Sequence, residues 1–98
     1  MGSRHFTTSQ DGDGAYLVKG ELSIRELDEL REFLEACRQD GKEITISLAE
    51  VRFIDTAALQ LLIAFKKGLA PKVALRISAV SSEVDDILGL CGLKNALL

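Results

Sequence analysis

The sequence predicts an α/β fold, a small mixed β-sheet of four to five strands with about three to four α-helices packed on it. A turn signal near the N-terminus indicates a β-hairpin, and a strand-like segment followed by a helix-like segment then occurs three times in succession. The hydrophobic content of 47% with a single Pro suits a chain that buries a core. Right-handed crossover connections would place the later strands parallel to one another.

The hairpin is predicted from Asp11-Gly12-Asp13-Gly14, because Asp-Gly pairs supply the positive φ angles that tight turns need. Residues 5–10 and 15–20 are its two expected strands, and Gly20 is expected to end the second. A calcium loop is excluded, because the Glu that closes such a loop downstream is absent.

A first amphipathic helix is predicted over residues 23–39. Ser23 is the expected N-cap and Glu26 completes a capping box. Apolar residues then recur at helical spacing: Leu27, Leu30, Phe33, Leu34 and Cys37. The β-branched segment 44–48 that follows is expected to be the central strand, covered by helices.

The second half of the chain continues the alternation of helix and strand. A helix is predicted over 56–68, with Lys66 and Lys67 suiting the negative end of its dipole, and a strand over 73–78. Ser82 is the expected cap of a third helix that ends near residue 90. Residues 96–98 are expected to form a weak final element.

Length and charge limit the classes of function. With 98 residues the chain has room for one domain, expected over 5–98, and residues 1–4 are expected to be a tag remnant or a disordered start. The net charge is −3 and the basic residues are scattered, which disfavours nucleic acid as a partner. The sequence shows neither a run long enough to insert into a membrane nor a secretory signal, so a cytoplasmic location is expected.

No catalytic or metal-binding pattern is found, so we expect neither an enzyme nor a cofactor or metal. Cys37 and Cys91 match no metal-ligand spacing and are interpreted as reduced, separate core thiols. His5, the single His, is interpreted as a solvated terminal residue, because nothing places an acid–base partner beside it.

The informative segment is the junction at Asp55 and Thr56, where a strand passes into a helix. Asp55 is predicted to be the N-cap of that helix, and Thr56 lies in its first turn with its hydroxyl near solvent. A phosphate there would be favoured by the positive end of the helix dipole. The pair is also explained by helix capping alone, and the residues leave both interpretations open.

This junction resembles the signature of the STAS domain family, named for sulfate transporters and anti-sigma factor antagonists. The similar segments cover most of the chain: Gly20-Glu21-Leu22, Ile44 to Leu48, Phe53-Ile54-Asp55-Thr56-Ala57 and Cys91-Gly92-Leu93. The resemblance implies the STAS fold. It also implies phosphorylation of Thr56, because in the antagonists a partner kinase that is also an anti-sigma factor phosphorylates the Ser or Thr after the motif Asp.

The chain departs from the family pattern at three places. Ser47 stands where the family commonly has Asp near the end of the central strand, and Ala58 stands where it has Gly. The chain stops at Leu98, where many relatives continue into a further helix. The motif is also similar to STAS proteins linked to chemotaxis clusters and to the STAS subunit of bacterial lipid-transport ATPases.

The leading hypothesis is a non-enzymatic switch module that binds a protein partner, an anti-sigma factor or a serine/threonine kinase, and is controlled by phosphorylation of Thr56. The expected partner-binding residues are Phe53, Asp55, Thr56, Ala57, Ala58 and Leu61. The apolar run 57–65 is equally explained by burial in the core. The alternative is a constitutive subunit of a chemotaxis-linked complex or a lipid-transport ATPase, not phosphorylated. A third hypothesis, a small-molecule sensor, has no supporting cluster of residues.

Overall fold

The computed structural model describes residues 6–39, 43–69 and 72–98. His5 and the expected tag remnant at residues 1–4 lie outside this part of the chain. The order of elements is β1 (Phe6–Gln10), β2 (Tyr16–Leu22), the 3₁₀ turn η1 (Ile24–Glu26), α1 (Leu27–Arg38), β3 (Ile44–Ile54), α2 (Thr56–Leu69), β4 (Leu75–Val80), α3 (Ser82–Cys91) and α4 (Lys94–Leu97). The predicted α/β fold class is confirmed.

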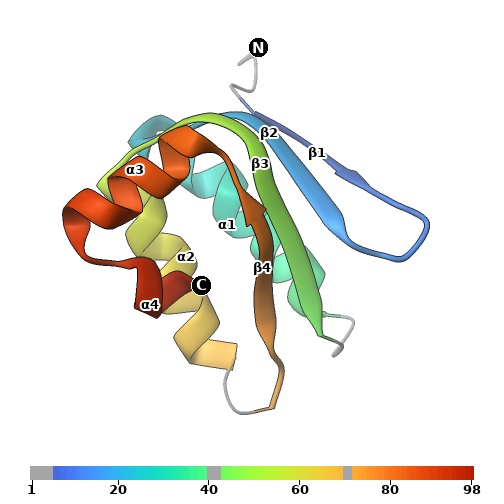
Figure 1. The fold of residues 1–98 in the computed structure, drawn as a ribbon. Coiled ribbons are helices and arrows are strands. Elements are labelled where there is room, and N and C mark those ends of the chain that lie inside the picture. Colours follow the sequence, from blue (N-terminus) through green and yellow to red (C-terminus); the bar gives the residue numbers. More distant parts are fainter. Residues whose placement is uncertain (1–5, 40–42, 70–71) are drawn as a thin grey trace.

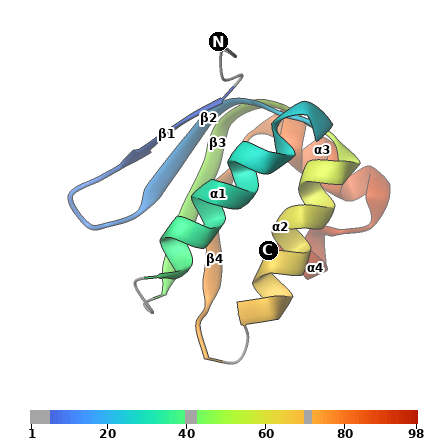
Figure 2. The same cartoon turned by 180° about the vertical axis from the view of Figure 1, so that it is seen from behind.

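The strands form one mixed sheet in the order β1-β2-β3-β4, with β1 antiparallel to β2 and the other two pairs parallel. The segment 44–48 therefore lies in a central strand, as predicted. Successive right-handed crossovers in one direction place their helices on the same face, and α1 and α2 cover one face together (Figures 1 and 2). The opposite face is open over β1 and β2 (Figure 1).

The core lies between the sheet and its helices. Alternate residues of β3 point inward, among them Ile44, Ile46 and Leu48, and pack with Leu34 of α1 and Leu62 of α2, all at most 2% exposed. Beside this cluster, the rings of Tyr16 and Phe33 meet edge to face with centroids 5.3 Å apart. The C-terminal helices complete the core, because Leu97 of α4 is fully buried.

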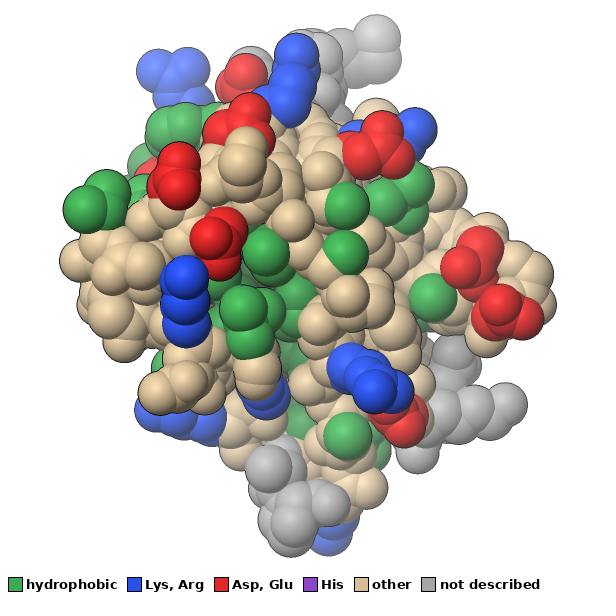
Figure 3. Space-filling view, viewed as in Figure 1, with side chains coloured by type: hydrophobic (Ala, Val, Ile, Leu, Met, Phe, Trp, Pro, Cys, Tyr) green, Lys and Arg blue, Asp and Glu red, His purple; other side chains and the backbone are tan. Residues whose placement is uncertain are grey.

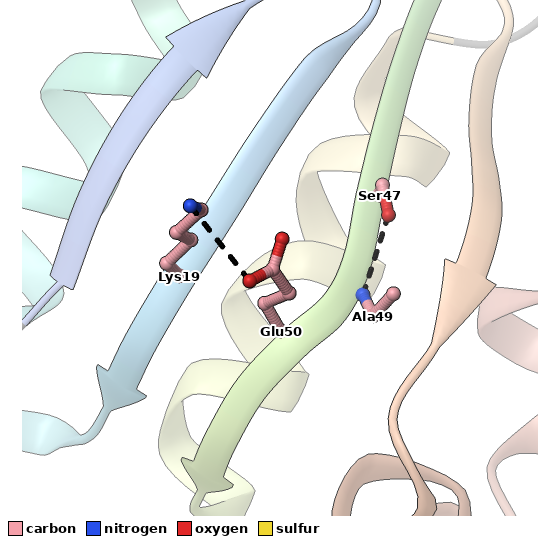
Figure 4. A network of polar contacts seen from close by, with 4 residues as sticks. All are labelled: Lys19, Ser47, Ala49 and Glu50. Atoms are coloured by element: carbon pink, nitrogen blue, oxygen red, sulfur yellow. Dashed lines mark hydrogen bonds and ion pairs between the residues drawn. The ribbon is translucent and has the colours of Figure 1, made fainter.

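The open face of the sheet carries polar and charged side chains among apolar ones (Figure 3). Lys19 Nζ lies 3.7 Å from Glu50 Oε1 on the next strand, and both side chains are about half exposed (Figure 4). Ser47 Oγ accepts a hydrogen bond from the backbone N–H of Ala49 at 3.3 Å (Figure 4). The basic side chains on the face seen in Figure 3 lie apart from one another among acidic and neutral ones.

The hairpin forms as predicted, and its turn explains Asp11. The carboxylate oxygen Oδ1 of Asp11 accepts hydrogen bonds from the backbone N–H groups of Asp13 and Ala15, at 2.8 and 3.0 Å. The second strand differs from the prediction, because Gly20 lies inside it at φ 108°. The register to β3 shifts between Gly20 and Glu21, so Gly20 forms an irregularity that lets the strand continue to Leu22.

The first two predicted helices begin differently from each other. Ser23 caps η1, accepting from the N–H of Arg25, and its hydroxyl donates to the carboxylate of Glu26. The predicted helix over 23–39 is therefore a 3₁₀ turn followed by α1, which ends at Arg38. The helix predicted over 56–68 is confirmed as α2, Thr56–Leu69.

Three further predictions need correction. The strand predicted over 73–78 is β4 at Leu75–Val80, and the third helix is capped by Ser81, whose Oγ accepts from the N–H of Val84. Neither cysteine forms a disulfide, but only Cys37 is a core thiol, because Cys91 is exposed at the end of α3. The weak final element is α4, whose Leu97 carbonyl accepts a hydrogen bond from Lys66 Nζ at 2.8 Å.

Leu34 and Leu90 provide a matched test of this core. Leu34 is 0% exposed and Leu90 is 88% exposed. We expect Leu34→Ala to lower the free energy of unfolding by about 2–5 kcal/mol, because it removes buried methyl groups and leaves a cavity, and Leu90→Ala to change it by less than about 0.5 kcal/mol. Urea denaturation of both variants measures the difference. Equal losses would show that α1 does not pack as described.

Candidate functional site

The candidate site is the junction between β3 and α2. The strand ends at Ile54 and the helix begins at Thr56, so Asp55 is the one residue between them. Ile54 is 3% exposed and points into the core, whereas the preceding Phe53 is 48% exposed. The chain therefore presents a large aromatic side chain at the surface immediately before the helix start.

Asp55 is the N-cap of α2, as predicted. Its Oδ1 accepts a hydrogen bond from the backbone N–H of Ala58 at 2.9 Å. Its Oδ2 accepts a second one, at 2.8 Å, from the backbone N–H of Ile24 in η1. One carboxylate thus joins the start of α2 to the turn that precedes α1.

The backbone strengthens the same connection. The N–H of Asp55 donates to the carbonyl of Leu22 at 3.1 Å, and the carbonyl of Asp55 accepts from Leu59 within α2. The ends of two parallel strands, β2 and β3, are therefore held together beside the start of α2. This arrangement fixes the position of Asp55 from both sides.

Thr56 is exposed in the first turn of α2, as predicted. That turn contains no acidic residue of its own, but the capping carboxylate of Asp55 lies at the positive end of the helix dipole. A phosphate on the Thr56 hydroxyl would sit at the surface, and adding it would require no change in the packing of the core. The Thr56 hydroxyl therefore lies at the surface at the start of α2, outside the packed core.

The remaining predicted partner-binding residues differ in their exposure to solvent. Ala57 and Leu61 are half-buried on the side of α2 that reaches the surface. Ala58 is 0% exposed and lies in the core, so the prediction that it contributes to a partner surface is wrong. It faces inward because α2 is covered on more than one side, and the contribution of Ala58 to the site is its backbone N–H.

Ile24 is the residue that sequence reasoning missed. It is 66% exposed, and its backbone N–H bonds to Asp55. It precedes Leu27 by three residues, a spacing that fits a buried helical position, so no sequence signal marked it as exposed. Ile24, Phe53, Thr56, Ala57 and Leu61, with Asp55 beneath them, are called the switch surface below.

Ser47, which departs from the family pattern, lies away from the switch surface. The predicted central strand ended at residue 48, which placed Ser47 near the strand end, but β3 continues to Ile54. At about 3.3 Å per residue, Ser47 is about 26 Å from Asp55 along the strand. Its hydroxyl bonds locally, to the N–H of Ala49 on the open face.

Among residues 6–39, 43–69 and 72–98, no three His, Cys, Asp or Glu side chains are grouped so that they could hold a metal ion. None of the helices in these same ranges has the length and apolar character needed to cross a membrane.

The chain is similar in sequence to a known domain family and to known proteins. The protein-family model described as "Mlab, STAS domain" matches residues 6–98. An anti-sigma-B factor antagonist from Staphylococcus aureus (strain NCTC 8325 / PS 47) is 33% identical over 93 residues, which cover 93% of this chain and 86% of the relative. The protein of the same name from Staphylococcus epidermidis is 33% identical over 89 residues, 87% of this chain and 82% of the relative.

Two crystal structures share the fold. An anti-sigma factor antagonist from Mycobacterium paratuberculosis superposes with a TM-score of 0.76 at 24% identity, covering 94% of this chain and 82% of the other. An antisigma-factor antagonist STAS domain from Rhodobacter sphaeroides gives a TM-score of 0.51 at 18% identity, covering 83% of this chain and 87% of the other.

Because Asp55 accepts two backbone hydrogen bonds, replacing it should lower the free energy of unfolding more than replacing an ordinary surface carboxylate. We expect Asp55→Ala to lower the free energy of unfolding by about 1–3 kcal/mol, because two backbone N–H groups lose a charged acceptor. The matched control is Asp86→Ala, because Asp86 is exposed in α3. This substitution should lower the free energy of unfolding by less than about 0.5 kcal/mol. Thermal or urea unfolding checks both, and equal effects would contradict the bridging role.

Proposed function

Because this chain belongs to the STAS domain family, we propose that it is a non-enzymatic switch module that binds a protein partner through the switch surface and is controlled by phosphorylation of Thr56. The partner is an anti-sigma factor, and the modifying enzyme is a serine/threonine kinase. The observation that carries the proposal is the exposed Thr56 in the first turn of α2, directly after a capping Asp55 and beside exposed apolar residues.

The chemistry of the switch surface supports a protein partner. Ile24 and Phe53 are two of the four large hydrophobic side chains that are exposed in the described part of the chain. The hydrogen bond from the Ile24 N–H to Asp55 links η1, which carries Ile24, to the residue that follows Phe53. Large apolar side chains exposed on neighbouring segments of a chain are typical of protein interaction sites. The names of the staphylococcal relatives support an anti-sigma factor as that partner.

Phosphorylation would control binding through charge and desolvation. A phosphate adds about −1.5 to −2 charges at neutral pH. When no partner is bound, water solvates that charge at the exposed Thr56, so the folded chain tolerates it although the Asp55 carboxylate is its neighbour. Docking of an apolar or acidic partner surface would remove the water around the phosphate, which opposes binding.

No catalytic residue is assigned to this chain. The kinase therefore transfers the phosphoryl group from ATP to Thr56. A cytoplasmic location is part of the same proposal, because the kinase uses ATP, which is present in the cytoplasm. Neither Cys37 nor Cys91 forms a disulfide, which is in keeping with a reducing compartment.

Phosphorylation is tested with the purified chain, ATP and the anti-sigma factor kinases of its native host. We expect mass spectrometry to locate one phosphate on Thr56 and Thr56→Ala to abolish it, with the free energy of unfolding changed by less than about 0.5 kcal/mol. Thr56→Glu should fold normally and bind the anti-sigma factor more weakly. Absence of phosphate on Thr56 in protein from the native host, together with unchanged binding by Thr56→Glu, would replace the switch with a constitutive assembly subunit.

The apolar part of the switch surface has its own test. We expect Ile24→Ala and Phe53→Ala each to weaken binding of the anti-sigma factor about fivefold or more, because central apolar anchors carry much of the energy of an interface. Leu90→Ala removes an even more exposed apolar side chain from α3 and should leave the dissociation constant unchanged. Isothermal titration calorimetry measures all three. If Leu90→Ala alone weakened binding, the partner would dock on α3.

A further inference from the structure

We propose that the outer edge of β1 binds a second copy of this chain, so that the two β1 strands pair antiparallel about a twofold axis at Thr8. This surface is separate from the switch surface, because no residue of β1 belongs to that surface. Self-association and partner binding can therefore be tested independently.

β1 is an outer strand of the sheet with a regular geometry. It has β2 on one side, and no strand of the described residues lies on its other side. Its register with β2 runs from Phe6 opposite Gly20 to Gln10 opposite Tyr16 without a shift. Both ribbon views show the outer edge of β1 with no helix drawn across it (Figures 1 and 2).

The hydrogen-bond pattern of the hairpin identifies which backbone groups face outward. The N–H of Asp11 donates to the carbonyl of Ala15 at 2.9 Å, so these residues form a hydrogen-bonded pair. Opposite residues of an antiparallel ladder alternate between hydrogen-bonded and non-hydrogen-bonded pairs. Counting back along the register, Ser9 and Thr7 bond to β2, whereas Gln10, Thr8 and Phe6 direct their N–H and C=O groups to the outer edge.

The chemistry of this edge lacks the usual protection against pairing. Natural proteins block exposed strand edges with Lys or other charges, Pro or bulges. The other outer strand, β4, carries the exposed Arg76. The five residues of β1, Phe-Thr-Thr-Ser-Gln, contain neither a charge nor Pro, and their register is free of a bulge.

The same strand is complementary to itself. In a twofold register centred on Thr8, Thr8 lies opposite Thr8, and Phe6 lies opposite Gln10 of the second copy. These are the residues with outward backbone groups, so three hydrogen-bonded pairs form, with two hydrogen bonds in each. A chain with a net charge of −3 repels its own copies through its acidic surfaces, and an uncharged edge avoids that repulsion. These features favour a second copy as the occupant.

Thr8→Pro and Thr8→Ala form a matched pair of test variants. Because the Thr8 N–H faces outward, Pro removes no hydrogen bond to β2 and is tolerated on an outer strand, but it blocks pairing at the centre of the proposed interface. We expect sedimentation equilibrium to show a concentration-dependent dimer for the native chain and for Thr8→Ala. The dissociation constant should rise about tenfold or more in Thr8→Pro. A native chain that remains monomeric at millimolar concentration would overturn the proposal.

A charge-pair experiment tests the register itself and does not depend on Pro. Thr8→Lys and Thr8→Glu each place like charges opposite one another at the twofold axis, so each variant alone should be monomeric. An equimolar mixture should form a heterodimer, because opposite charges then meet. Circular dichroism of each variant confirms that it is folded. Failure of the mixture to associate, or dimers of either variant alone as tight as the native dimer, would show that Thr8 does not face Thr8.

Discussion

The carboxylate of Asp55 is the interaction on which the geometry of the switch surface depends. It accepts backbone hydrogen bonds from Ala58 in α2 and from Ile24 in η1, and so ties the starts of two helices to the end of one strand. Both donors are backbone groups that would otherwise lack a partner at a helix start. Ile24 itself and the helical turn that contains Thr56 are both held by the Asp55 carboxylate. This side chain therefore positions Ile24 and Thr56 relative to each other.

The parallel sheet brings these segments together. Parallel neighbours end at the same edge, so the carboxyl ends of β2 and β3 lie beside each other, and the residues that follow each strand form one surface. Gly20 contributes at a distance, because its positive φ allows β2 to continue to Leu22. The Leu22 carbonyl then accepts the hydrogen bond from the Asp55 N–H. A feature inside β2 thus supports the switch surface beyond it.

Helix α2 combines a structural role and a surface role along the same apolar segment. Ala58, Leu59, Leu62 and Ile63 are buried, because the helix packs on the sheet and also contacts α1 and α4. The rest of the helix reaches the surface, with Gln60, Ala64 and Lys67 exposed and Ala57 and Leu61 half-buried. The apolar run therefore serves mainly the core, and a small part of it is left for a partner.

The sequence by itself determined the elements whose signals are local: the hairpin at Asp11, the cap at Asp55, the exposed Thr56 and the alternation of strands and helices, because turns and helix caps depend on neighbouring residues. Only the tertiary structure decided the remainder. The exposure of Ile24, the burial of Ala58, the exposed Cys91 and the outward groups of β1 depend on contacts between segments distant in sequence or on packing around a helix. Periodicity shows that a face is apolar, but it does not show which neighbouring element covers that face.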